Sequence, residues 1–218
     1  MKKTLLALAS LAVLGLAMNS AQAQEVYGGI GMPGLVMLGY STPLAKDFGG
    51  RIELGTGLNY SLNGNRDGVE VNGKFKSDTA GAFVDWFPVA RSAFRFVGGV
   101  TVNNTKAELN AAGTGMAMVN GVHVNMAGET YNVNVKFADV TPYIGIGYGH
   151  AKTFTKGLGF YADVGLMLGD YTVTTNTSLV KNGKVSQADV DAQSMKLRDG
   201  FKSTNFMPSV SLGATYRF

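Results

Sequence analysis

The sequence predicts an all-β protein, an eight-stranded antiparallel transmembrane β-barrel with short periplasmic turns and long extracellular loops. The first observation lies in residues 208–218, where apolar side chains at even positions alternate with small or polar side chains up to Phe218. A period of two over this length indicates a β-strand with one apolar and one polar face. The second observation is that the alternation recurs along the chain. The third is that the charged residues fall on one face of it.

The amino terminus predicts export. Lys2 and Lys3 precede an uncharged apolar stretch over residues 4–17, and Ala21-Gln22-Ala23 follows as a small-x-small cleavage pattern. The stretch is too short for a membrane-spanning helix, which needs roughly 20 apolar residues. We therefore expect residues 1–23 to be a signal peptide cleaved after Ala23, and residues 24–218 to form one β-domain in the cell outer membrane.

Eight segments show the two-residue period. In each, large apolar side chains occupy one face, and glycines, polar residues and a few large residues occupy the other. The predicted strands are residues 26–31, 36–41, 48–60, 80–86, 94–103, 140–149, 158–169 and 208–218.

The connections between these strands differ in length. Three are short (residues 42–47, 88–92 and 151–157), and three are long (residues 61–74, 104–134 and 172–204). The first connection, near Met32-Pro33-Gly34, is tight and is the one exception to the alternation. Alternating short and long connections with an even strand count are typical of outer-membrane barrels. Each long connection contains an Asn-Gly pair, which favours a type I′ turn. Asn72-Gly73, Asn120-Gly121 and Asn182-Gly183 therefore predict ordered β-hairpins or strand extensions.

The charged residues of the strands distinguish a membrane barrel from a soluble one. All of them lie on the small, polar face: Arg51, Glu53, Asp85, Arg95, Asp163 and Arg217. A charge facing lipid at mid-bilayer costs about 2–4 kcal/mol, so exclusion from the apolar face is expected of a barrel in a membrane. A soluble barrel would place its apolar face inside.

The six charges are expected to form a polar network in the lumen. Unpaired charges are costly in a narrow interior of low dielectric constant, so mutual pairing is the natural expectation. Three interpretations remain open, namely a salt-bridged structural plug, a gate in a small pore, and catalysis. The equal number of cations and anions favours the plug.

Composition and motifs exclude several functions. The net charge of +4 includes two signal-peptide lysines, so it gives little reason to expect a nucleic-acid partner, and cysteine is absent. His150 falls at a periplasmic strand end and His123 in a long loop, without the paired base and nucleophile that catalysis needs. Gly29–Gly34 matches a dinucleotide fingerprint by letter, but no helix follows it. We therefore predict no enzymatic activity, no cofactor and no metal site.

The last long connection leaves one partner open. It carries the basic residues Lys181, Lys184, Lys196, Arg198 and Lys202. These side chains would suit the phosphates of lipopolysaccharide. Ordinary solubility explains them equally well, because three aspartates, Asp189, Asp191 and Asp199, share the segment.

The signal peptide, the eight alternating segments and the terminal Tyr216-Arg217-Phe218 resemble the small outer-membrane β-barrel superfamily, which includes the OmpA membrane domain, OmpX, OmpW and opacity-type surface proteins. The resemblance implies that Tyr216 and Phe218 form an assembly signal read by the barrel-insertion machinery. It also implies contact with outer-membrane lipids.

These observations predict a monomeric protein with a structural or surface-interaction role, performed by its extracellular loops, and a lumen plugged by polar residues. The alternative is a narrow channel for ions or small solutes. Two further readings have less support: a lipid-modifying outer-membrane enzyme, and a soluble periplasmic barrel that binds an apolar ligand.

Overall fold

A computed structural model describes residues 24–66, 68–150, 156–202 and 205–218. The predicted signal peptide lies outside the described residues. The elements are β1 (Glu25–Met32), β2 (Val36–Ala45), β3 (Phe48–Arg66), β4 (Val69–Trp86), β5 (Phe94–Asn103), β6 (Lys106–Gly113), β7 (Met116–Val119), β8 (Val122–Asn125), β9 (Glu129–Phe137), β10 (Val140–Tyr148), β11 (Gly157–Leu168), β12 (Tyr171–Thr177), α2 (Gln187–Lys202) and β13 (Phe206–Arg217).

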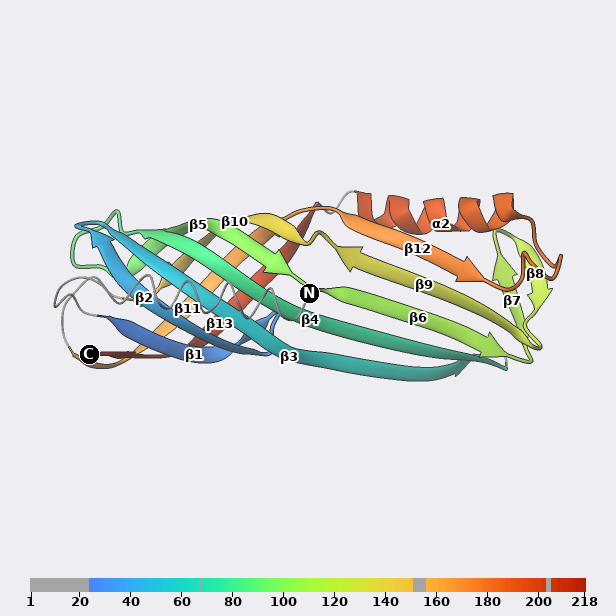
Figure 1. Ribbon diagram of the computed structural model, residues 1–218, viewed down its shortest axis with the longest axis horizontal. Coiled ribbons are helices and arrows are strands. Elements are labelled where there is room, and N and C mark those ends of the chain that lie inside the picture. Colours follow the sequence, from blue (N-terminus) through green and yellow to red (C-terminus); the bar gives the residue numbers. More distant parts are fainter. Residues whose placement is uncertain (1–23, 67, 151–155, 203–204) are drawn as a thin grey trace.

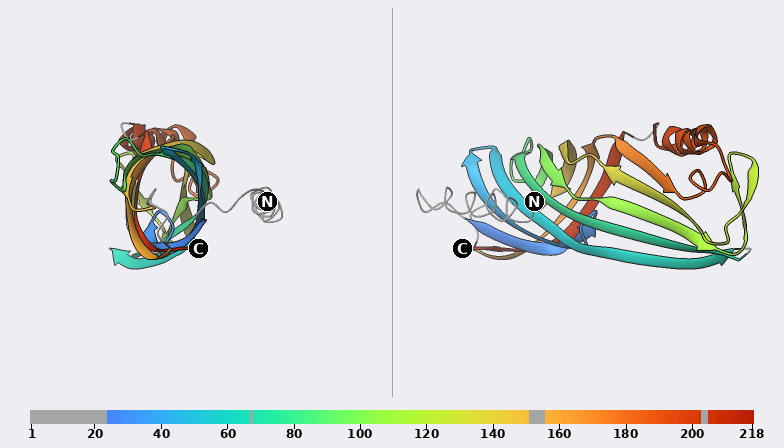
Figure 2. Two further views of the ribbon diagram at one scale, coloured as in Figure 1. Left: turned by 90° about the vertical axis from the view of Figure 1, so that its left-hand side faces the viewer. Right: turned by 45° about the vertical axis from the view of Figure 1, so that its right-hand side comes forward.

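Eight of the strands pair in a closed antiparallel ring. Their order is β5-β4-β3-β2-β1-β13-β11-β10, and the pairing of β10 with β5 completes the circle. The ring is seen along its axis in the left-hand view of Figure 2. Each predicted segment overlaps one ring strand. The first and last strands of the described chain lie side by side, with Glu25 opposite Arg217.

Five strands form a sheet that rises from one wall of the ring. The second half of β3 and the first half of β4 continue beyond the ring. They are joined there by β6, β9 and β12, which gives a sheet of eleven strands in all. The β7–β8 hairpin and α2 lie against this part, at the far end from the C-terminus (Figure 1). We call these elements the extension. Of the helices in the described residues, none has the length and apolarity needed to cross a membrane.

The extension has its own hydrophobic core, formed by the sheet, the hairpin and the helix. Its buried members are Val69, Val119, Val124, Met126, Leu179, Val185 and Val190.

The long connections are therefore folded, and the prediction of β-hairpins or strand extensions at the Asn-Gly pairs is confirmed at two of the three pairs and wrong at the third. Asn72-Gly73 lies inside β4, in a strand extension and not at a turn, because β3 ends at Arg66 and β4 begins at Val69. Asn182-Gly183 lies in a turn that leads into α2, not in a β-hairpin. Asn120-Gly121 does form the β7–β8 turn, with positive φ values of 48° and 85°, as a type I′ turn requires. The helix itself was not predicted.

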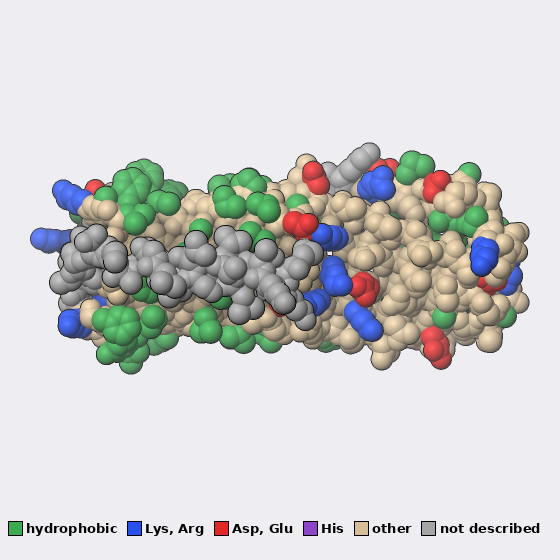
Figure 3. Space-filling model, viewed as in Figure 1, with side chains coloured by type: hydrophobic (Ala, Val, Ile, Leu, Met, Phe, Trp, Pro, Cys, Tyr) green, Lys and Arg blue, Asp and Glu red, His purple; other side chains and the backbone are tan. Residues whose placement is uncertain are grey.

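The ring is apolar outside and polar inside. On β11, Leu158 and Phe160 are 83% and 84% exposed, whereas Tyr161 is only 3% exposed. Hydrophobic side chains lie on the surface of the half of the molecule that holds the ring (Figure 3). This arrangement is the inverse of a soluble barrel, and it agrees with the parity read from the sequence.

Large side chains and glycines pack together inside the ring. A Cβ at Gly39 would overlap the Tyr27 ring, and a Cβ at Gly81 or Gly99 would overlap Phe83. Toward the extension, the lumen is filled by an apolar cluster of Phe83, Val97, Phe137, Tyr143, Met167 and Met207. The alternation of small and large residues thus fills a narrow interior, as expected for eight strands.

Candidate functional site

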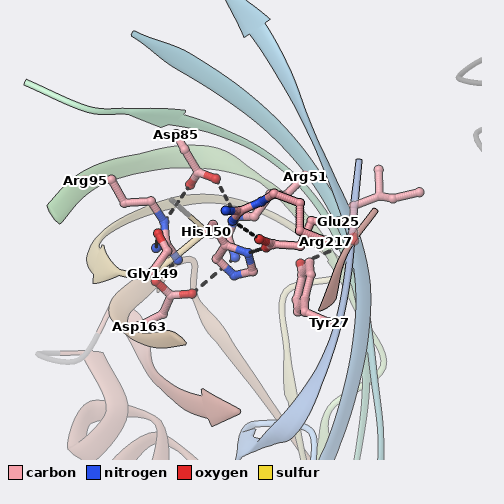
Figure 4. A network of polar contacts seen from close by, with 10 residues as sticks. Glu25, Tyr27, Arg51, Asp85, Arg95, Gly149, His150, Asp163 and Arg217 are labelled. Atoms are coloured by element: carbon pink, nitrogen blue, oxygen red, sulfur yellow. Dashed lines mark hydrogen bonds and ion pairs between the residues drawn. The ribbon is translucent and has the colours of Figure 1, made fainter. Parts of the chain in front are cut away.

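Four buried side chains form a closed cycle of ion pairs across the lumen (Figure 4). Arg51 of β3 contacts Asp85 of β4 (Nε–Oδ2 2.7 Å) and Asp163 of β11 (Nη1–Oδ2 3.2 Å). Arg95 of β5 contacts the same carboxylates, with Nε–Oδ1 3.1 Å to Asp85 and Nη2–Oδ1 2.5 Å to Asp163. Each carboxylate therefore bridges both guanidinium groups, and the four charges sum to zero.

Backbone register brings Arg95 and Asp163 to one level. Gly147 of β10 lies directly opposite Arg95 on one side and Asp163 on the other. A Cβ at Gly147 would overlap the Asp163 carboxylate and come within 2.9 Å of the Arg95 guanidinium. The glycine therefore leaves the space in which the Arg95–Asp163 pair forms.

A second cluster lies next to the first. The Glu25 carboxylate contacts Arg217 Nη2 and His150 Nδ1, and all three residues are buried. The Tyr27 ring packs edge-on against His150, with centroids 4.4 Å apart. Arg95 Nη1 donates to the Gly149 carbonyl oxygen at 2.7 Å, next to His150, and this bond connects the two clusters.

The six predicted lumen charges therefore occupy three settings. Arg51, Asp85, Arg95 and Asp163 form the cycle, whereas Arg217 belongs to the second cluster. Glu53 lies outside the cycle and lines a cavity of about 20 Å³ beside Arg51 and Asp163. A volume of this size holds one or two water molecules.

Glu25 and His150 were missed by sequence reasoning. Glu25 shares the parity of Tyr27 and could have been placed in the lumen by the alternation of β1. His150 follows the end of β10 and has a positive φ of 52°, so the alternation does not extend to it.

Chemically, the arrangement places two cations and two anions in mutual contact inside the ring. A buried ion pair requires good geometry and additional hydrogen bonds to offset the cost of desolvating two charges. The Arg95 guanidinium meets this requirement with hydrogen bonds to Asp85, Asp163 and the Gly149 carbonyl oxygen. Arg51 donates one hydrogen bond, to Asp163, and its contact with Asp85 is an ion pair without hydrogen-bond geometry. The Arg51 guanidinium also lies 5.2 Å from the Phe83 ring centroid and 5.8 Å from that of Tyr27. Aromatic packing thus holds one cation of the cycle in place.

In the extension, a buried carboxylate joins β9 to the segment before α2. Glu129 accepts hydrogen bonds from Ser178 Oγ (2.5 Å) and Asn182 Nδ2 (2.9 and 3.0 Å), and it contacts Lys184 Nζ at 3.0 Å. The hydrogen bonds from Ser178, Asn182 and Lys184 lower the pKa of Glu129 to about 2. We call this group the Glu129 clasp.

Helix α2 is fixed to the β7–β8 turn. Asn120 receives Lys196 Nζ at 2.8 Å on its side-chain oxygen, and its Nδ2 donates to Asp189 at 3.2 Å. Ser186 caps the helix by accepting from the Asp189 backbone N–H at 3.1 Å. Several basic residues of the last connection are thus engaged within the extension.

The terminal aromatic residues face outward. Tyr216 and Phe218 are 48% and 52% exposed, and their rings meet edge-on at 5.3 Å. Their role as an assembly signal stays a prediction. In the part of the chain that the structure describes, no group of three His, Cys, Asp or Glu side chains could hold a metal ion.

Comparisons with known proteins support the fold. No protein-family model matches the sequence, and no curated protein is significantly similar to it. The crystal structure of CarO2 from Acinetobacter baumannii superposes with a TM-score of 0.62 at 15% identity, covering 92% of this chain and all of that one. CarO from the same organism gives 0.61 at 16% identity, covering 89% and 97%. At this identity the likeness establishes a shared fold. The finer assignment to OmpA, OmpX or OmpW is not confirmed.

Proposed function

We propose that this chain is an eight-stranded transmembrane β-barrel of a bacterial outer membrane, with a plugged lumen and a structural or surface-interaction role carried by the extension. Its ring presents apolar side chains outward, and the solved structures that it resembles are outer-membrane β-barrel proteins. In this orientation the short connections face the periplasm, and the extension faces outward.

The observation that carries the proposal is the ion-pair cycle of Arg51, Asp85, Arg95 and Asp163. Its members come from four strands, and the side chains are 6% exposed or less. An ion or solute crossing the lumen would have to disrupt these pairs and leave buried charges uncompensated. Removing one partner of a buried pair costs about 3–5 kcal/mol for that reason. The apolar cluster around Phe137 and Met167 blocks the path toward the extension as well.

A folded extension suits surface interaction better than catalysis. Its sheet, hairpin and helix share a hydrophobic core, so they present a fixed outer surface. His150 is buried against Glu25 in the ring, and His123 lies exposed on the β7–β8 hairpin. Neither position offers the base and nucleophile pair that a lipid-modifying outer-membrane enzyme would need.

Conductance tests the plug. We expect the purified protein to give no defined openings in planar bilayers. We expect leakage only when Arg51→Ala and Arg95→Ala are combined with Phe137→Ala and Met167→Ala, because the apolar cluster blocks the lumen as well. Well-defined openings of the wild type would favour the narrow channel instead.

Location is tested separately: the protein should fractionate with outer membranes, resist urea extraction and show heat-modifiable gel mobility. A urea-extractable protein would contradict the membrane barrel.

A further inference from the structure

Three lysines form a row across the outward face of the extension. Lys76 of β4 lies opposite Lys106 of β6, and Lys106 lies opposite Lys136 of β9. Directly opposed residues in antiparallel strands have Cβ atoms about 4.5–5.5 Å apart, so their side chains emerge as neighbours on one face. We call Lys76, Lys106 and Lys136 the lysine row. Basic side chains gather in this middle part of the molecule in Figure 3.

The lysine row lies just above the apolar outer surface of the ring. Val102 of β5 is paired with Ala80 of β4 on one side and with Val140 of β10 on the other. Val140 is 62% exposed. Along β4, Ala80, Asp78 and Lys76 are successive residues on the outward face. The row is therefore two outward positions beyond the apolar surface.

Other sectors of the ring end differently. The corresponding outer ends of β1, β2, β11 and β13 present Met32, Val36, Leu168 and Phe206, all of them 37% exposed or more. The lysine row is thus confined to the β4–β6–β9 side.

Each lysine contacts a carboxylate but remains partly exposed to solvent. Lys76 contacts Asp78 at 3.0 Å, Lys106 contacts Glu108 at 2.9 Å, and Lys136 contacts Asp139 at 2.7 Å. The lysine side chains are 40–46% exposed. Ion pairs of this kind are worth at most about 1 kcal/mol. Because these exposed ion pairs are weak, a phosphate group can compete with each carboxylate for its lysine.

We propose that the lysine row binds the phosphate groups of a phosphorylated glycolipid of the outer leaflet, with its acyl chains against Val102, Val140 and Ile144. The inference rests on the proposed outer-membrane location and names a partner for it. Lysine is a strong phosphate ligand, and basic residues at a membrane surface each contribute about 1 kcal/mol toward anionic lipid. A lipid source is favoured over free phosphate because the apolar surface lies directly below the row. Ile144 is 52% exposed on that surface.

The basic residues of the last connection are less suited to binding phosphate than the lysine row. Lys184 contacts the Glu129 carboxylate, Lys196 contacts Asn120, and Arg198 contacts the Val173 carbonyl oxygen. These cations are used in the packing of the extension. A control variant that includes Lys196 therefore separates the two candidate surfaces.

The test compares two variants with the same change in charge. In one, Lys76, Lys106 and Lys136 are replaced by Gln, and in the control, Lys46, Lys181 and Lys196 are replaced by Gln. Folded, detergent-solubilised full-length protein is titrated with purified lipopolysaccharide, with dephosphorylated lipopolysaccharide and with inorganic phosphate. We expect the row variant to bind lipopolysaccharide at least about tenfold more weakly, and the control to bind within about twofold of wild type.

The other arms identify the source of the anion. Dephosphorylated lipopolysaccharide should bind wild type as weakly as intact lipopolysaccharide binds the row variant, and inorganic phosphate should not saturate the site at millimolar concentration. Equal binding of intact lipopolysaccharide by wild type and the row variant would overturn the inference, as would saturation by inorganic phosphate. Heat-modifiable mobility of wild type in outer-membrane fractions is measured in parallel. If the protein is present there but the row variant binds normally, the lysine row fails and the proposed location stands.

Discussion

Arg95 and Asp163 form a buried ion pair of 2.5 Å although 68 residues separate them in the chain. They reach one another across the strand between them, β10, where Gly147 has no side chain to intervene. The pair therefore depends on three strands at once. Substituting Arg95, Gly147 or Asp163 should therefore affect the stability of the ring as a whole.

Arg95→Ala and Asp163→Ala should each destabilise the protein by about 3–5 kcal/mol, because each leaves a buried charge with one partner fewer. The double variant should cost clearly less than the sum, since the two residues interact directly. Urea unfolding followed by heat-modifiable mobility measures these changes. Lys46→Ala is an exposed control with no expected effect. Additive losses in the double variant would contradict the network.

Gly147→Ala should destabilise the ring by about 1–3 kcal/mol, because the added Cβ would enter the space of the Asp163 carboxylate and the Arg95 guanidinium. Gly98→Ala is the matched control. Gly98 lies on neighbouring β5, and a Cβ there would meet no atom within 4 Å. Both variants are compared in the same unfolding assay. Equal stability of the two variants would show that the lumen tolerates a side chain at position 147.

Acid should loosen the Glu129 clasp. Hydrogen bonding lowers the pKa of Glu129 from 4.5 to about 2 in the folded state. A group with a lowered folded pKa contributes stability that is present above its unfolded pKa and lost as pH falls through the folded one. The protection of amides in residues 178–185, measured relative to their intrinsic exchange rates at each pH, should therefore fall between about pH 4.5 and pH 2.

Glu129→Gln is the control for this acid effect. The variant keeps a side-chain oxygen near Ser178 and Asn182 but cannot carry the negative charge opposite Lys184. The protection of amides in residues 178–185 should then be lower than in wild type at neutral pH and should depend less on pH. A variant with the same pH dependence as wild type would assign the effect to another acid, such as Asp189.

Side-chain alternation was sufficient to predict where the ring strands lie, because a lipid-facing and a lumen-facing residue must succeed each other along every strand. The same parity placed Arg51, Asp85 and Asp163 in the lumen. It could not specify which charges pair, since pairing depends on the stagger between strands. Arg217 accordingly meets Glu25, at the level where β1 and β13 run side by side.

Local turn signals were less informative than the alternation. Gly73 lies within β4 between the side chains of Leu62 and Leu109, a position set by pairing with two strands and not by the Asn-Gly pair. Helix α2 was missed because its apolar contribution to the extension core is small. Val190 is its one buried hydrophobic residue among those described, and Met195 is 54% exposed.

The attachment of α2 provides the last prediction. Asn120 has a positive φ of 48°, which costs most L-residues about 1–2 kcal/mol, and its side chain bonds Asp189 and Lys196. Asn120→Ala should lose both bonds and strain the turn, whereas Asn120→Gly should lose the bonds but relieve the strain. Hydrogen exchange across α2 should therefore accelerate in both variants, and more in Asn120→Ala. If Asn120→Gly exchanged as fast as Asn120→Ala, the strain of the turn would contribute nothing, and the loss of the two side-chain bonds would account for the whole effect.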